Sequence, residues 1–125
     1  MFSHLMIGSN DIEKSKTFYD ALFIAMGGRE GSVDPKGRLL YIHNKNVFMI
    51  TAPIDGEAAT FANGGTIGFA MDSPEQADAW HAAGLANGGV SIEDPPGWRE
   101  GGGVRMYLAY LRDPDGNKIC GLHRG

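Results

Sequence analysis

The order of structural signals along this chain repeats once, and this repeat limits the folds that the chain can adopt. Residues 2–8 and 66–71 are short, mostly apolar runs typical of β-strands, and a helix-start signal follows each of them. The two helical patterns end at paired glycines, Gly27-Gly28 and Gly88-Gly89. Because the same order returns after about 60 residues, we expect a duplicated unit.

The two helix starts carry separate capping signals. Asn10 is the expected N-cap of the first helix, with Glu13 three residues later as in a capping box. Ser73 is the expected N-cap of the second helix, with Pro74 at the first helical position and Gln76 completing the box. Both patterns therefore predict helices that begin directly after a strand.

Short β-type segments follow each helix. Residues 39–43 and 47–51 are two such runs joined by Asn44-Lys45-Asn46, which predicts a hairpin. Further strands are expected at 90–92, 105–111 and 118–123, with Asp113-Pro114-Asp115-Gly116-Asn117 as a strong turn. Each half then has the order βαβββ, in an α+β fold. We expect one domain of two modules, about 1–58 and 63–125.

Composition excludes several classes of protein. The single Cys cannot form an internal disulfide, and no CxxC pair offers a structural zinc site. The net charge of −4 argues against nucleic acid as a partner. No apolar run approaches the roughly 18–20 residues of a membrane span, and the first residues lack a basic signal-peptide start. We therefore expect a cytoplasmic protein that does not bind membranes.

Three segments resemble the vicinal oxygen chelate superfamily, which includes glyoxalase I, bleomycin-resistance proteins and extradiol dioxygenases. They are His4 followed by SNDIEKSKTFYDALF, then TIGFAMDSPEQADAW, and finally YLAYLRDPDGNKI, whose D-P-D-G-N turn is the most specific. The resemblance implies two βαβββ modules that form a curled mixed β-sheet cup with the helices outside. It also implies a homodimer, a small-molecule ligand and a divalent metal in the cup.

The metal ligands that the resemblance implies are mostly missing. The family's four ligands, typically His, Glu, His or Gln, and Glu, correspond here to His4, Met49, Thr66 and Cys120. Only His4 matches. A catalytic metal needs about three good protein ligands, and a thioether and a hydroxyl bind hard cations poorly. His4 and Cys120 are the remaining weak candidates for a softer ion such as Zn²⁺.

His4 and Cys120 also have interpretations that need no metal. His4 is the candidate catalytic residue, as a general base or a hydrogen-bond donor to substrate, or it is a buried structural histidine. Cys120 is a nucleophile only if a neighbouring cation lowers its pKa, and otherwise an inert buried thiol that borders the ligand pocket. His43, at the hairpin turn, has no partner at ligand spacing and is expected in solvent.

Four further residues are candidates for the pocket. Tyr107 and Tyr110 lie on one predicted strand but in opposite phase, so at most one of them faces the cup, and core packing is the alternative for both. Residues 93–103 are expected to form a Pro- and Gly-rich loop. Within it, Trp98 and Arg99 either form a flap over an anionic or aromatic ligand or stabilise the loop by packing.

Three functions follow from these residues and the resemblance. The first is a lyase- or isomerase-type enzyme acting on a small oxygenated metabolite, with a degenerate metal site and with His4 as the polar anchor. The second is a metal-free protein that binds a drug or metabolite. The third is a metal-dependent lactoylglutathione lyase or dioxygenase with a non-standard ligand set. The ligand count favours the first two.

Overall fold

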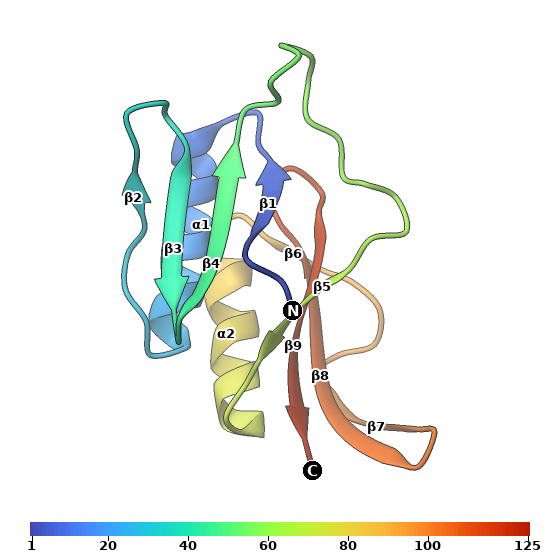
Figure 1. Cartoon of the computed structure of the whole chain (residues 1–125). Coiled ribbons are helices and arrows are strands. Elements are labelled where there is room, and N and C mark those ends of the chain that lie inside the picture. Colours follow the sequence, from blue (N-terminus) through green and yellow to red (C-terminus); the bar gives the residue numbers. More distant parts are fainter.

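The computed structural model describes residues 1–125 and contains two helices and two mixed sheets, so the fold is α+β (Figure 1). The first half comprises β1 (Leu5–Gly8), α1 (Ile12–Ala25), β2 (Ser32–Val33), β3 (Leu39–His43) and β4 (Asn46–Thr51). The second half comprises β5 (Ile67–Ala70), α2 (Pro74–Ala86), β6 (Val90–Ser91), β7 (Gly97–Gly101), β8 (Val104–Arg112) and β9 (Lys118–Arg124). The repeated order that the sequence predicts is thus confirmed, and β7 is an additional strand.

Each half builds its own sheet, and the two sheets repeat one topology. The order is β1-β4-β3-β2 in the first sheet and β5-β9-β8-β6 in the second, with β7 on β8. In each, the first strand of the half runs parallel to the last one, as β1 does to β4 and β5 to β9. The sheets are not closed and agree with the curled cup that the resemblance implies.

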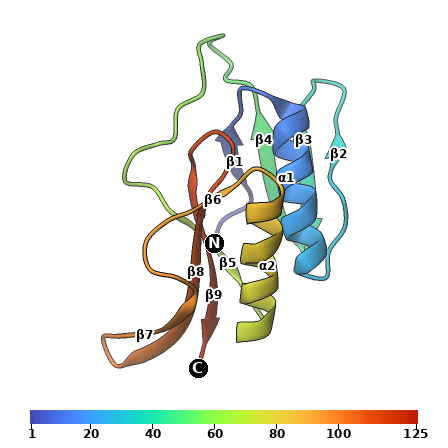
Figure 2. The same cartoon turned by 180° about the vertical axis from the view of Figure 1, so that it is seen from behind.

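The two helices lie side by side on one side of both sheets (Figure 2). Helix α1 buries large side chains, among them Phe18 and Leu22, and α2 buries Trp80 together with the small residue Gly84. A Cβ atom added at Gly84 would lie 2.4 Å from Leu111 Cδ1 and 3.3 Å from both Leu22 and Phe18. Glycine therefore lets α2 lie close to Leu111 of β8 and to α1, and a larger residue would force these side chains to move.

The turn between β8 and β9 fastens the second half onto the start of α1. Asp115 accepts hydrogen bonds from the Asn10 backbone N–H (2.9 Å) and the Ser15 hydroxyl (3.3 Å). The buried Tyr19 hydroxyl donates to Asp113 Oδ2 at 2.7 Å. Burial raises the pKa of Asp113, and the hydrogen bonds from Tyr19 and Asn117 oppose that shift. The D-P-D-G-N segment is therefore both a hairpin turn and a junction between the halves.

The helix caps follow the sequence in one half and differ in the other. Ser73 caps α2 as predicted, accepting from the Gln76 N–H, and Pro74 is its first residue. For α1 the predicted cap was wrong, because Asp11 accepts the hydrogen bond from the Lys14 N–H. Asn10 is instead paired with the backbone of Ala59, donating to its carbonyl at 3.2 Å and accepting from its N–H at 2.7 Å. These bonds hold the loop between β4 and β5.

Two strand predictions also need correction. The first strand is shorter than residues 2–8 and begins at Leu5, so His4 precedes it. Residues 93–103 are not a loop throughout, because residues 97–101 form β7 and pair with β8 from Gly97–Leu108 to Gly101–Val104. Neither helix is long and apolar enough to cross a membrane.

Candidate functional site

The four positions at which the resemblance implies metal ligands are divided between the two sheets. Met49, on β4, is half-buried and lies beside Met6 of β1. His4 and Thr66 are exposed and directly precede β1 and β5. Cys120 is buried on β9, where it pairs in register with Gly68 and Tyr110.

These residues do not fit the divalent metal. The structure contains no group of three or more His, Cys, Asp or Glu side chains that could hold an ion. A cysteine ligand must be a thiolate, but burial raises the pKa of the Cys120 thiol, with Lys118 lowering it and Glu93 raising it. Met49 and Thr66 offer only a thioether and a hydroxyl, which are weak donors. We therefore derive no chemical step through a metal.

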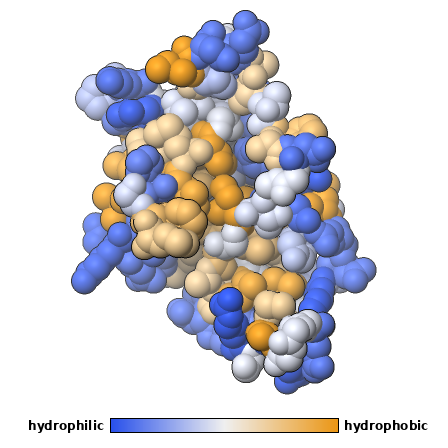
Figure 3. Space-filling view, turned by 45° about the vertical axis from the view of Figure 1, so that its right-hand side comes forward, coloured by the Kyte–Doolittle hydropathy of each residue, from blue (hydrophilic) through white to orange (hydrophobic).

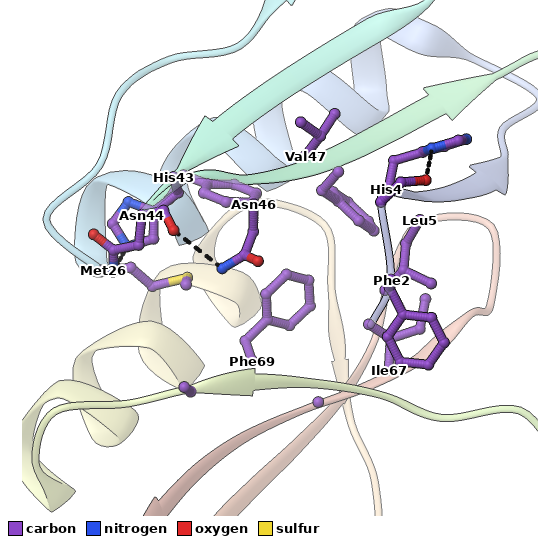
Figure 4. Close-up of a pocket in the computed structure, with 15 residues that line it drawn as sticks. Phe2, His4, Leu5, Met26, His43, Asn44, Asn46, Val47, Ile67 and Phe69 are labelled. Carbon is purple, nitrogen blue, oxygen red and sulfur yellow. Dashed lines mark hydrogen bonds between the residues drawn. The ribbon is translucent and has the colours of Figure 1, made fainter.

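The histidine that the sequence singles out lies beside a serine. Ser3 Oγ and His4 Nδ1 are 2.8 Å apart and form a hydrogen bond, which involves Nδ1 and leaves Nε2 out. Figure 4 shows the His4 ring pointing away from Phe2 and Phe69. His4 is exposed, so its imidazole is accessible to solvent.

The expected flap residues have partners within their own hairpin. Arg99 donates to the carbonyls of Gly97 (2.8 Å), Asp94 (2.9 Å) and Pro95 (3.0 Å), and so fixes the segment before β7. Trp98 packs edge-on against Tyr107, with ring centroids 5.4 Å apart. These contacts hold both side chains to the β7–β8 hairpin.

Both tyrosines of β8 are engaged, on opposite faces. The Tyr107 hydroxyl donates to Asp78 Oδ1 of α2 at 2.6 Å, so this ring faces the helix side. Tyr110 faces the other way, beside Cys120, and the Lys118 ammonium lies 5.1 Å from its ring centroid. Burial raises the pKa of Tyr110 first of all, and Cys120 and Glu93 raise it further while Lys118 opposes them.

A cavity of about 300 Å³ lies between the two halves of the chain. It is formed by the segment before β1, the end of α1, the β3–β4 hairpin and β5. Figure 3 shows apolar side chains gathered in a hollowed strip on one face, with hydrophilic residues around it. The lining residues, drawn as sticks in Figure 4, are Phe2, Ser3, His4, Leu5, Phe23, Met26, His43, Asn44, Asn46, Val47, Phe48, Ile67, Gly68, Phe69 and Ala70.

This lining is apolar and aromatic and contains no Asp, Glu, Lys or Arg. Phe69 stands edge-on to Phe48, at a centroid distance of 5.4 Å, and to Phe23, at 5.9 Å. The β3–β4 hairpin supplies three of the polar residues, and the Asn44 side-chain nitrogen is 3.3 Å from His43 Nε2; Ser3 and His4 supply two more. The cavity therefore offers ring faces and neutral hydrogen-bonding groups, but no opposite charge for an ionised ligand.

The sequence reasoning missed most of this cavity. Of the predicted site residues, only His4 lines it. His43 was expected in solvent but is half-buried, with its ring 6.1 Å from that of Phe23. The sequence signal that could have indicated this position is the Asn-Lys-Asn turn. In the structure Asn44 (φ 49°) and Lys45 (φ 67°) form a two-residue turn, which pairs His43 with Asn46. Thr66 lines a second, smaller cavity with Arg112 and Lys118.

Known proteins resemble the chain over almost its whole length. The family model described as the Glyoxalase/Bleomycin resistance protein/Dioxygenase superfamily matches residues 1–120. The crystal structure of a glyoxalase/bleomycin resistance protein from Albidiferax ferrireducens T118 has 57% sequence identity, a TM-score of 0.95 and 99% coverage of both chains. No curated protein matches the chain at a significant level.

Two more distant structures share the fold alone. A glyoxalase/bleomycin resistance protein/dioxygenase family enzyme from Burkholderia phytofirmans PsJN has 20% identity and a TM-score of 0.72, covering 97% of this chain and 96% of its own. A lactoylglutathione lyase from Agrobacterium tumefaciens has 18% identity and a TM-score of 0.67, covering 98% and 92%.

Proposed function

Since this chain belongs to the glyoxalase/bleomycin resistance protein/dioxygenase superfamily, whose fold serves both catalysis and binding, we propose that it binds a small molecule without a metal. The ligand is an uncharged organic compound with a ring, held in the cavity of about 300 Å³ between the two halves. This size lies at the lower end of the range for small-molecule pockets.

The observation that carries this proposal is the composition of the lining. Its 15 residues include 9 hydrophobic ones and no acidic or basic side chain apart from histidine. Burying an ionised group there would be unfavourable, because no opposite charge compensates for its lost hydration. A ring can contact Phe69 while its polar substituent reaches the amide of Asn44 or Asn46.

A matched pair of probes tests the preference for uncharged ligands. Binding of benzyl alcohol and of benzoate, which differ mainly in charge, is measured by NMR titration of the backbone amides. We expect the alcohol to shift the amides of His43, Asn46 and Phe69, and benzoate to bind there at least about tenfold more weakly, a difference of about 1.4 kcal/mol. Equal affinities at these amides would contradict the proposal.

A cavity-filling variant tests the location. Ala70 lines the cavity and is exposed, so Ala70→Leu adds volume at the binding position with little effect on folding. We expect it to weaken binding of benzyl alcohol at least about tenfold. Ala82→Leu, on the exposed face of α2, is the control and leaves the affinity unchanged. Unaltered binding in Ala70→Leu would place the ligand elsewhere.

A lyase or isomerase acting on a small oxygenated metabolite is the second candidate. The hydrogen bond between Ser3 and His4 supports it, because a ring held through Nδ1 can transfer protons at Nε2. In a panel of such metabolites, turnover that His4→Ala reduces about a hundredfold at unchanged affinity would favour this candidate. Turnover insensitive to that substitution would exclude His4 as the base.

We also propose that the chain forms a homodimer, as the resemblance implies. The exposed apolar side chains Met6 and Ile42, on one face of the first sheet, support an interface. Light scattering coupled to size-exclusion chromatography measures the mass in solution. Twice the mass of one chain supports the proposal, with Met6→Lys shifting the mass toward the monomer; a monomeric wild-type protein would contradict it.

A further inference from the structure

A second cavity, of about 190 Å³, has a different chemistry from the first. The loop between β4 and β5 folds beside the end of the second sheet and encloses it. The lining residues are Phe61, Ala62, Asn63, Gly64, Gly65, Thr66, Arg112 and Lys118. Two of these are cationic and none is acidic, although the whole chain carries a net charge of −4.

The strand register explains why the cations meet. Lys118 and Arg112 are paired in register where β9 and β8 leave the turn. Ile67 of β5 is paired with Ile119, which places Thr66 at the same end of the sheet. The start of β5 and the adjoining ends of β9 and β8 thus bring a hydroxyl, an ammonium and a guanidinium together.

Both cations are held by neighbouring groups. Arg112 donates one hydrogen bond to the Gly116 carbonyl at 2.8 Å, and its guanidinium lies 5.7 Å from the centroid of the Phe61 ring. Lys118 forms an ion pair with Glu93, which is exposed and is not among the lining residues. The guanidinium has five donors and the ammonium three, so each retains donors for a ligand.

We propose that this cavity binds the oxyanion of a small metabolite, a carboxylate or a phosphate group. A guanidinium can hold either group through two parallel hydrogen bonds, and a nearby ammonium adds attraction without a fixed direction. The Thr66 hydroxyl and the Asn63 amide supply uncharged donors.

The same arrangement opposes a bound metal. Thr66 and Cys120 occupy two of the positions where the resemblance implies metal ligands, and Lys118 stands beside both in the sheet. A divalent cation there would be repelled by Lys118 and Arg112, whereas an anion is attracted. In this chain the electrostatics of the second sheet are therefore suited to an anion.

Titration with sodium phosphate and with sodium acetate, followed by backbone NMR shifts at constant ionic strength, tests the site. We expect saturable shifts at Thr66, Arg112 and Lys118 with at least one anion, and the tighter of the two identifies the oxyanion class. Arg112→Gln and Lys118→Gln each weaken that binding by roughly tenfold. Arg124→Gln, the same charge change at the exposed end of β9, alters it less than about twofold.

A variant that strengthens binding is a useful control, because a gain in affinity cannot result from loss of folding. Glu93→Gln removes the carboxylate that competes for Lys118, so the affinity for the anion should rise by roughly threefold. No saturable shift with either anion, or equal weakening by Arg124→Gln, would overturn the proposal. Benzyl alcohol binding in the first cavity is measured on the same variants, so failure of one site is distinguished from failure of the other.

Discussion

The two halves of the chain share an order of elements, but the two cavities differ in the charge of their lining side chains. The larger cavity draws neutral and aromatic residues mainly from the first half, together with β5. The smaller one draws Arg112 and Lys118 from the last two strands of the second half. A duplicated backbone thus sets where strands lie, while the residues on each strand face decide the charge of the ligand.

The helices differ in a complementary way. Helix α1 buries Phe18, Tyr19 and Leu22, whereas α2 buries Trp80 together with the small residues Ala77 and Gly84. Phe18 and Leu22 of α1 lie against Gly84 of α2, which brings the two helices close together.

The largest expected effect comes from breaking this fit. Gly84→Val places a branched side chain where even a Cβ atom would lie 2.4 Å from Leu111 Cδ1, and it should lower the free energy of unfolding by about 3 kcal/mol. Urea denaturation followed by circular dichroism measures the change. Ala82→Val, on the exposed side of the same helix, is the matched control and should change stability by less than about 0.5 kcal/mol. Equal losses in both variants would mean that the close approach does not matter.

A smaller effect is expected from cutting the junction between the halves. Tyr19→Phe removes the donor to the buried Asp113 carboxyl, and we expect a loss of about 2 kcal/mol in unfolding free energy. Tyr110→Phe is the comparison, since Tyr110 lies half-buried on the face away from the helices. If the two variants were equally stable, the hydrogen bond to Asp113 would contribute nothing.

A smaller effect still is expected from salt, which should weaken ligand binding in one cavity but not in the other. Raising the ionic strength from 0.05 to 0.5 M should weaken anion binding at Arg112 and Lys118 by roughly threefold to tenfold, because salt screens exposed charges. Benzyl alcohol binding at the uncharged lining should stay the same or strengthen slightly. Calorimetric titrations at both ionic strengths measure this. Equal salt dependence at the two sites would contradict a difference in charge between the two linings.

The smallest expected effect is that of divalent metals. Zn²⁺ or Mn²⁺ at tenfold molar excess should leave the melting temperature unchanged, because the donors at His4, Met49, Thr66 and Cys120 do not form a metal-binding group. Phosphate or acetate at saturation should raise it by mass action. Differential scanning fluorimetry compares the two; a rise with metal that His4→Ala abolishes would contradict the assignment.

The sequence predicted what depends on local rules. Ser73 and Pro74 start α2, Gly27 and Gly88 follow the helix ends with positive φ, and the hairpin turn lies at Asn44. Each of these signals involves residues within a few positions of one another, so no knowledge of distant contacts was needed.

Features that depend on distant partners were not predictable in this way. Asn10 is a good N-cap by type, but the backbone of Ala59 occupies its side chain and Asp11 caps instead. The larger cavity gathers residues from four segments, so no single motif reveals it. Strand β7 contains Gly97 and Gly101 at its ends, which resemble loop composition, and pairing with β8 overrides that preference.

The junction at the D-P-D-G-N turn also bears on how the chain is made. Because Asp115 engages the Asn10 N–H and the Ser15 hydroxyl, the N-terminal turn of α1 lacks these partners until residues 113–117 have been synthesised. On the ribosome, the first half would therefore emerge early but remain unfinished until the second half was almost complete. Nascent chains truncated before this turn should be more sensitive to proteases than the whole chain. They should also bind chaperones more than the whole chain does.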